Sequence, residues 1–225
     1  MRHDAVRMTP HTSPDDLIVQ SPEDRPARLL IALHHGMGSS ARAMLPLGRL
    51  LAQAFADAAI VSVAAPFESD TGRGYQWFSA RGVTDDNRMA RIEAVMPRFV
   101  ERMQSLQARF GSLPAATVLA GFSQGGILSL ESARAGQGLA SRIVAIGARF
   151  AHLPQTWPDP ACIHLVHGDD DPVIPVSHAV DAASRLAQLG ARVTLDRFAG
   201  TGHDTSAAMA QCIVERLQAA APPAP

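Results

Sequence analysis

The chain has 225 residues, of which 47% are apolar and 18% charged, a composition that fits one globular domain with a substantial core. Its 20 Lys and Arg nearly balance 21 Asp and Glu, and the net charge of −1 argues against nucleic acid or an anionic membrane surface as the main partner. The two cysteines, Cys162 and Cys212, have neither close spacing nor a metal-ligand pattern, so we interpret them as inert thiols in a reducing compartment.

The two ends of the chain carry no recognisable targeting or membrane signal. Residues 1–16 are polar and hold no apolar stretch of the kind that a secretory signal needs. No run approaches the roughly 18 apolar residues of a transmembrane helix. We therefore expect a flexible leader over 1–16, a single domain over 17–219, a disordered tail over 220–225 and a cytoplasmic location.

Short apolar, β-branched runs alternate with helical patterns between these ends. The middle runs are almost continuously apolar, which is typical of parallel strands buried on both faces. The clearest helical pattern covers 84–110, and Pro97 inside it predicts a kink or a break. Strand–helix alternation of this kind predicts an α/β domain with a mostly parallel sheet. The expected strands are 17–20, 29–34, 60–64, 117–120, 143–146, 163–166 and 193–198, and the other expected helices are 41–56, 124–135, 176–189 and 204–219.

One junction between a strand and a helix has the pattern of a nucleophile elbow. The strand-prone run ATVLA (116–120) leads into GFSQG (121–125), and a helix-prone run follows. At such an elbow a sharp turn lifts one serine hydroxyl off the end of the sheet. The two glycines let the helix fold back closely over the strand, an approach that side chains would block. Ser123 is therefore the candidate nucleophile; the alternative is a surface serine in a glycine-rich loop.

A serine hydroxyl attacks well only when a base takes its proton, and a carboxylate must orient that base. In α/β-hydrolases these partners follow the nucleophile along the chain, first the acid and then a histidine. An aspartate run, Asp169 to Asp171, follows one apolar strand, and His203 follows the last strand in a glycine-bearing loop. The spacing leaves open which aspartate acts. The run could instead cap the next helix, and His203 could be a helix N-terminal residue without chemistry.

Hydrolysis through a tetrahedral intermediate also needs hydrogen-bond donors for the oxyanion. The backbone N–H of Gln124, which follows the nucleophile at the start of its helix, is the first candidate. The second is the backbone N–H of Met37, in the HGMG turn (35–38) that ends an earlier strand. The alternative for this turn is an ordinary glycine turn at a strand end.

Several motifs together make the sequence similar to the phospholipase/carboxylesterase family, which includes acyl-protein thioesterases. They are HGMG (35–38), GFSQGG (121–126), HGDDDPVIP (167–175) and GH (202–203), and QWFSARGVTDDNR (76–88) resembles a block of a small bacterial esterase branch. The resemblance spans residues 17–218 and implies an α/β-hydrolase fold, a mostly parallel central sheet with helices on both faces. It also implies the triad Ser123, Asp171 and His203, and hydrolysis of carboxylic esters and acyl thioesters without a metal or organic cofactor.

Two loops shape the expected substrate cleft. The connection from Gly147 to Cys162 is short and rich in proline, which argues against a helical insertion and predicts minimal or no lid. The loop over 67–83 concentrates aromatic residues in a chain that is only 5% aromatic. We interpret Trp77 and Phe78 as walls of the acyl site; the alternative is that they seal the edge of the core.

The sequence therefore predicts a serine hydrolase that cleaves carboxylic esters or acyl thioesters through an acyl-enzyme. Its expected partner is a small or lipid-like acyl substrate, and the expected assembly is a monomer or homodimer. Two other hypotheses stay open: a ligand- or partner-binding protein that keeps the fold without turnover, and a peptidase or lactone hydrolase with the same triad. A lost triad residue would favour binding alone, and none is missing here.

Overall fold

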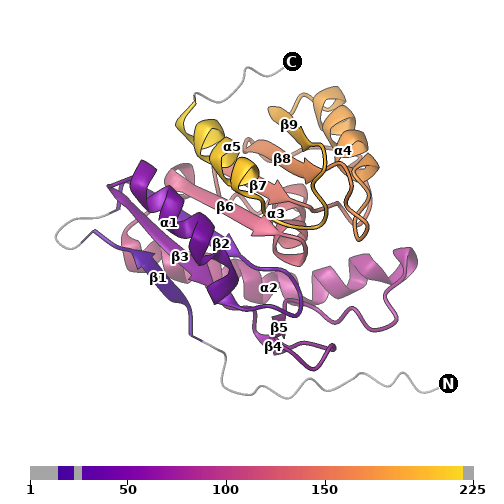
Figure 1. Ribbon diagram of the computed structural model, residues 1–225, viewed down its shortest axis with the longest axis horizontal. Coiled ribbons are helices and arrows are strands. Elements are labelled where there is room, and N and C mark those ends of the chain that lie inside the picture. The colour runs from indigo at the N-terminus through magenta and orange to yellow at the C-terminus, as the bar shows by residue number, and fades with distance from the viewer. Residues whose placement is uncertain (1–14, 23–26, 220–225) are drawn as a thin grey trace.

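The computed structural model describes residues 15–22 and 27–219 (Figure 1). Most of the predicted leader (1–14) and the predicted tail (220–225) lie outside the described residues. Asp15 and Asp16, the last two residues of the expected leader, are described and lead directly into the first strand. Within the described ranges, no helix has both the length and the apolar character needed to cross a bilayer.

A seven-stranded sheet forms the centre of the domain. Its order is β1–β3–β2–β6–β7–β8–β9, in which β1 runs antiparallel to β3 and every other neighbouring pair is parallel. The seven predicted strands are thus confirmed, with ends that differ by up to two residues. The strands are β1 (Leu17–Gln20), β2 (Leu29–His34), β3 (Ala58–Val63), β6 (Thr117–Phe122), β7 (Arg142–Ile146), β8 (Cys162–Gly168) and β9 (Val193–Phe198).

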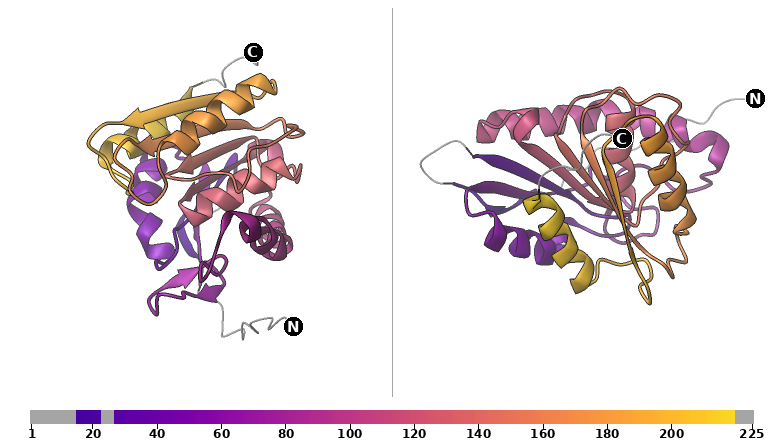
Figure 2. Two further views of the ribbon diagram at one scale, coloured as in Figure 1. Left: turned by 90° about the vertical axis from the view of Figure 1, so that its right-hand side faces the viewer. Right: turned by 90° about the horizontal axis from the view of Figure 1, so that it is seen from above.

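Helices cover both faces of the sheet, as predicted (Figure 2). α1 and α5 pack on one face, while α2, α3 and α4 pack on the other. Strand residues alternate between the two cores: Ile31 and Leu33 of β2 face α1 and α5, and Leu30 and Ala32 face the opposite way. The helices are α1 (Leu45–Ala54), which follows the short 3-10 helix η1 (Ala41–Met44), α2 (Asp85–Phe110), α3 (Gln124–Arg134), α4 (Ser177–Gln188) and α5 (Ala207–Gln218).

A kink or a break was predicted at Pro97. α2 instead runs through Pro97 as one helix of 26 residues, so the break does not occur. Proline inside a helix removes one backbone hydrogen bond and costs about 3 kcal/mol. Pro97 is exposed, and so is Glu93, whose carbonyl loses its partner, so water can satisfy that oxygen. Burial of the inner side chains Met96 and Phe99 on either side offsets the cost, at about 1.5–3 kcal/mol for each.

Two connections bear on the site. The segment between β3 and α2 contains a two-stranded antiparallel sheet, β4 (Phe67–Glu68) and β5 (Tyr75–Gln76), which was not predicted because two residues are too few to show an alternating pattern. An isolated bridge between Ser39 and Tyr75 joins this sheet to the loop after β2. The connection 147–161 contains no helix or strand, as expected for a fold without a helical lid.

Candidate active site

Ser123 lies in the turn between β6 and α3. Its φ of 52° and ψ of −118° make it the only non-glycine residue with a positive φ in the described part of the chain. Backbone strain of this kind is concentrated at functional sites. A Cβ at Gly121 would lie 2.3 Å from the carbonyl carbon of Gly125, and a Cβ at Gly125 would lie 2.4 Å from the carbonyl oxygen of His34. The prediction that a side chain would block the approach of the helix to its strand is confirmed at Gly121, whereas at Gly125 the side chain would meet the neighbouring strand β2.

Side chains from three separate strand ends meet beside this turn. His203, in the loop after β9, places its Nε2 3.0 Å from Ser123 Oγ and its Nδ1 2.7 Å from Asp171 Oδ2. Asp169, which follows the same strand as Asp171, instead accepts a hydrogen bond of 2.7 Å from Arg197 Nε. The tertiary structure therefore brings Ser123, His203 and Asp171 together and places Asp169 in a different ion pair.

Asp171 is buried within a set of hydrogen bonds. Its Oδ1 accepts from the backbone N–H groups of Val173 and Ile174, both at 2.8 Å. Burial disfavours the charged carboxylate, but the hydrogen bonds from His203 and these two N–H groups outweigh it and hold the pKa of Asp171 below its ordinary value. An ionised Asp171 accepts the Nδ1–H of His203, which leaves Nε2 of that ring free to accept a proton.

A second histidine, His167, lies beside the same carboxylate. Its Nε2 is 2.7 Å from the carbonyl oxygen of Ile174 and 3.3 Å from Asp171 Oδ2. Because a carbonyl oxygen only accepts, His167 Nε2 carries a hydrogen and donates it. His167 thus holds the turn that carries Asp171, a contact that the HGDDD motif alone does not indicate.

The loop after β2 passes directly over the elbow. A Cβ at Gly36 would lie 3.2 Å from the Cβ of Ser123. The Gly38 N–H donates to the carbonyl of Tyr75 at 2.9 Å, which fastens the loop. Among the described residues the Met37 N–H has no acceptor, and Gln124, as the first residue of α3, has none within its own helix. Both N–H groups can therefore bind a developing oxyanion.

His35 orients the peptide that carries the Met37 N–H. Its Nδ1 lies 2.7 Å from the Gly36 carbonyl oxygen, and its Nε2 lies 3.1 Å from the backbone nitrogen of Ala65. Because the first partner only accepts and the second only donates, His35 is neutral with its hydrogen on Nδ1. Burial lowers the pKa of His35, against the opposing effect of the Gly36 hydrogen bond, and so favours this form. In the sequence His35 stands out only as part of HGMG, which does not disclose the role of its ring.

The side chain of Gln124 ties the aromatic loop to the elbow. Its Oε1 accepts from the Trp77 N–H at 3.0 Å and its Nε2 donates to the Phe78 carbonyl at 2.9 Å. The indole of Trp77 donates to the His35 carbonyl at 2.8 Å. Trp77 and Phe78 are each 3% exposed and belong to the hydrophobic core. This placement fits the core-edge alternative, and their role as walls of the acyl site stays a prediction.

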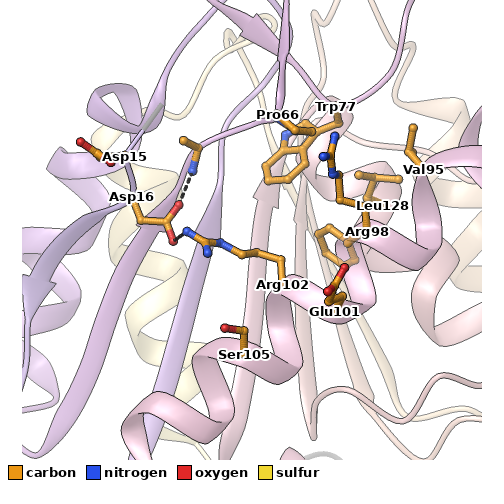
Figure 3. A pocket seen from close by; sticks show the side chains of 12 residues that line it. Asp15, Asp16, Pro66, Trp77, Val95, Arg98, Glu101, Arg102, Ser105 and Leu128 are labelled. Carbon is orange, nitrogen blue, oxygen red and sulfur yellow. Dashed lines mark hydrogen bonds and ion pairs between the residues drawn. The ribbon is translucent and has the colours of Figure 1, made fainter. Parts of the chain in front are cut away.

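Two hollows border this region on opposite faces of the sheet. The first, of about 330 Å³, lies between α2 and the residues leading into β1; Trp77 lines it, and no triad residue does so among its described lining (Figure 3). In it Arg102 forms an ion pair with Asp16, which also accepts the Ala64 N–H at 3.0 Å. The second, of about 770 Å³, lies on the side of α1 and α5 and includes Met37 in its lining.

Neither cysteine takes part in the site. Cys162 and Cys212 are both free, and burial raises the pKa of each thiol, which fits their interpretation as inert groups. Among the residues that the structure describes, no group of three or more His, Cys, Asp or Glu side chains is arranged to hold a metal ion.

Comparisons with known proteins show which family and which solved structures this chain is similar to. The family model described as Phospholipase/Carboxylesterase matches residues 14–221. Esterase YpfH of Escherichia coli (strain K12) is 47% identical over 189 residues, which cover 84% of this chain and 81% of that protein. The crystal structure of esterase PE8 superposes with a TM-score of 0.81 at 26% identity, covering 92% of this chain and 97% of the other. A carboxylesterase from Mesorhizobium loti, 21% identical with a TM-score of 0.73, shares the fold over 86% of this chain and 90% of its own.

Proposed function

This chain belongs to the phospholipase/carboxylesterase family, and from that premise we propose that it hydrolyses carboxylic esters and acyl thioesters through an acyl-enzyme on Ser123. In this proposal His203 and Asp171 complete the triad, and the N–H groups of Met37 and Gln124 bind the oxyanion. The observation that carries it is the pair of hydrogen bonds, 3.0 Å and 2.7 Å, that links Ser123 Oγ through His203 to Asp171.

Acylation begins when Ser123 Oγ attacks the carbonyl carbon and its proton moves to His203 Nε2. Asp171 stabilises the resulting imidazolium through its hydrogen bond with Nδ1–H. The former carbonyl oxygen becomes an oxyanion, which receives hydrogen bonds from the two backbone N–H groups. When the tetrahedral intermediate collapses, the bond to the leaving oxygen or sulfur breaks. His203 returns its proton to that atom, and the alcohol or thiol departs.

Deacylation repeats these steps with water. His203 takes a proton from the water as it attacks the acyl carbon, and a second tetrahedral intermediate forms. Its collapse breaks the bond to Ser123 Oγ, which recovers the proton from His203 Nε2. The products are one carboxylic acid and one alcohol or thiol, and no outside oxidant, reductant or metal enters the balance.

Ester hydrolysis is favoured over the alternative of binding without turnover. Two of the proteins to which this chain is similar, YpfH and PE8, are named as esterases. A protein that only bound ligands would not need a strained serine within 3.0 Å of an imidazole that is itself paired with a buried carboxylate. Such an arrangement favours proton transfer during attack.

The first test removes the nucleophile. We expect Ser123→Ala to lower the rate of p-nitrophenyl acetate hydrolysis about 10⁶-fold, by analogy with another serine hydrolase. A fluorophosphonate probe should label the wild-type protein on a single peptide, the one that contains Ser123. The matched control is Ser184→Ala, an exposed serine on α4, which should keep both activity and labelling. Retention of more than a few per cent of the rate by Ser123→Ala, or labelling of a different peptide, would refute the proposal.

A further inference from the structure

One end of the groove of about 770 Å³ lies next to the proposed nucleophile and base. Its lining includes Met37 of the proposed oxyanion loop, Phe122 immediately before the nucleophile, and Asp204 immediately after the base. The Phe122 ring also lies 4.7 Å from the ring of His203, centroid to centroid. Neither hollow has Ser123, Asp171 or His203 in its described lining. This groove, however, is lined by Met37 and by the chain neighbours of Ser123 and His203, so one end of it lies beside the position where the ester carbonyl must sit.

From this point the groove runs between the two helices on one face of the sheet. α1 and α5 contact each other and lie side by side on that face (Figures 1 and 2). One wall comes from η1 and α1, and the other from the loop after His203 and the first turn of α5. The wall residues are Ala43, Met44, Pro46, Leu47 and Leu50 on the first side, and Thr205, Ser206, Ala207, Ala210 and Gln211 on the second.

The lining of this groove is mostly apolar, and most of its polar side chains lie on the α5 side. Met44 and Leu47 are buried at its floor, and Leu50 and Phe122 are half-buried. Among the described lining residues, Asp204 is the one ionised side chain. A negative charge beside the proposed base disfavours an anionic ligand there, and no Lys or Arg is among the described residues that line the groove. Such a surface suits an uncharged hydrocarbon.

We infer that this α1–α5 groove binds the hydrocarbon chain of the ester substrate. The inference rests on the proposed function, because the chain must be attached to an ester group held at Ser123. The chain enters past Met37 and Phe122 and lies against the apolar side chains of α1. The chain belongs to the acyl part or to the alcohol part of the ester, and the two parts are separable by experiment.

The size of the groove sets an expected chain length. The wall from Ala43 to Leu50 spans roughly 10 Å of helix. An extended chain of tetrahedral atoms advances roughly 1.2 Å per bond, so a chain laid along this wall fills it with about eight bonds. Full burial of each methylene corresponds to about a fourfold gain in binding, and an open groove delivers less. We therefore expect kcat/KM to rise at least about tenfold from two to eight carbons and then to level off.

Two substrate series and a matched pair of variants test this inference. One series is p-nitrophenyl esters from acetate to dodecanoate, and the other is acetate esters of alcohols from methanol to octanol. Ala207→Trp places an indole in the groove from its α5 wall, and Ala43→Trp does the same from the opposite wall. Ala208→Trp is the control, since Ala208 is the exposed neighbour of Ala207 in α5 and does not line the groove.

The measured quantity is the ratio of kcat/KM for the eight-carbon ester to that for the shortest ester of the same series. We expect this ratio to fall about tenfold or more in Ala207→Trp and Ala43→Trp, and to stay within twofold of wild type in Ala208→Trp. The series in which the ratio falls identifies the part of the ester that occupies the groove. Circular dichroism melting curves establish that each variant is folded.

Two results would overturn the inference. One is a wild-type ratio near one in both series, which needs no variant and so does not depend on their folding. The other is an unchanged ratio in both folded groove variants. In either case Ser123-dependent hydrolysis of acetate esters would leave the proposed function standing, whereas its absence would remove the proposed function itself.

Discussion

The rim of the proposed active site and the layer directly beneath it both contain imidazoles, but their surroundings differ. His203 at the rim has a side chain that is 15% exposed, and a carboxylate 2.7 Å from its Nδ1. His34, at the end of β2 under the elbow, is fully buried against Trp77 and Phe99, and its Nε2 has no hydrogen-bond partner among the residues that the structure describes. Burial, followed by the neighbouring His35, lowers the pKa of His34 to about 3. The comparison teaches that the same residue type has different surroundings in the two layers: one imidazole lies between a hydroxyl and a carboxylate, and the other is enclosed by aromatic rings.

Among the changes that test this comparison of imidazoles, changing the carboxylate partner of His203 should have the largest effect. In Asp171→Asn the amide oxygen still accepts the hydrogen bonds from the N–H groups of Val173 and Ile174. The NH₂ group of the new side chain therefore faces Nδ1 of His203. His203 then holds its hydrogen on Nε2 and cannot accept the proton of Ser123. We expect kcat for p-nitrophenyl acetate to fall about 10⁴-fold, with the fold unchanged. Asp169→Asn is the control on the same turn, and an equal loss in that variant would contradict the assignment of Asp171.

The buried imidazole beneath the rim should make the fold sensitive to acid. His34 becomes protonated near pH 6.5 in the unfolded chain, but only near pH 3 in the folded protein. Between these pH values the unfolded state binds more protons than the folded state. The free energy of unfolding therefore falls as the pH drops through this range. At pH 4.5 this linkage removes roughly 2–3 kcal/mol from the free energy of unfolding relative to pH 7.5. His34→Phe keeps an aromatic ring at the position but has no group to protonate there. Between pH 7.5 and pH 4.5 its free energy of unfolding should therefore fall by that amount less than the wild-type value does.

Urea unfolding of wild type and His34→Phe at pH 7.5 and 4.5 measures this difference. His152→Phe, at an exposed position, is the matched control and should retain the wild-type pH dependence. If His34→Phe lost as much stability as wild type between pH 7.5 and pH 4.5, His34 would already be protonated in the folded protein at pH 4.5, and the prediction would be wrong.

His35 lies between these extremes, since it is buried but both of its ring nitrogens are paired. His35→Phe removes both hydrogen bonds and frees the Gly36–Met37 peptide to rotate. Because the oxyanion forms only during the reaction, we expect kcat to fall about tenfold while KM stays within twofold. His35→Gln can donate to Gly36 and accept from Ala65, so it should recover part of the rate. A change in KM without a change in kcat would indicate a role in substrate binding instead.

Much of the fold and of the candidate site could be predicted from residue patterns. Each buried strand is a short apolar run, and α2 shows a clear helical period, so these elements were predicted with small errors at their ends. The turn at Ser123 was recognisable because the flanking glycines reflect a local steric need. β4 and β5 were missed because two-residue strands carry no period, and the break at Pro97 failed to form because packing along the rest of α2 offsets one lost hydrogen bond.

The sequence by itself determined the order of strands and helices, the elbow, and the placement of acid and histidine after later strands, because these features arise from local propensity and local sterics. The spacing left Asp169 and Asp171 open, and the family resemblance implied Asp171; the tertiary structure shows that Asp171 contacts His203 and that Asp169 pairs with Arg197. Only the tertiary structure decided that His35 pairs with Gly36 and Ala65, and that a groove opens between α1 and α5 next to Phe122. The physical reason is that these contacts join segments far apart in the chain. Their geometry depends on how the whole sheet twists and how both helical layers pack against it, and no short run of residues encodes that.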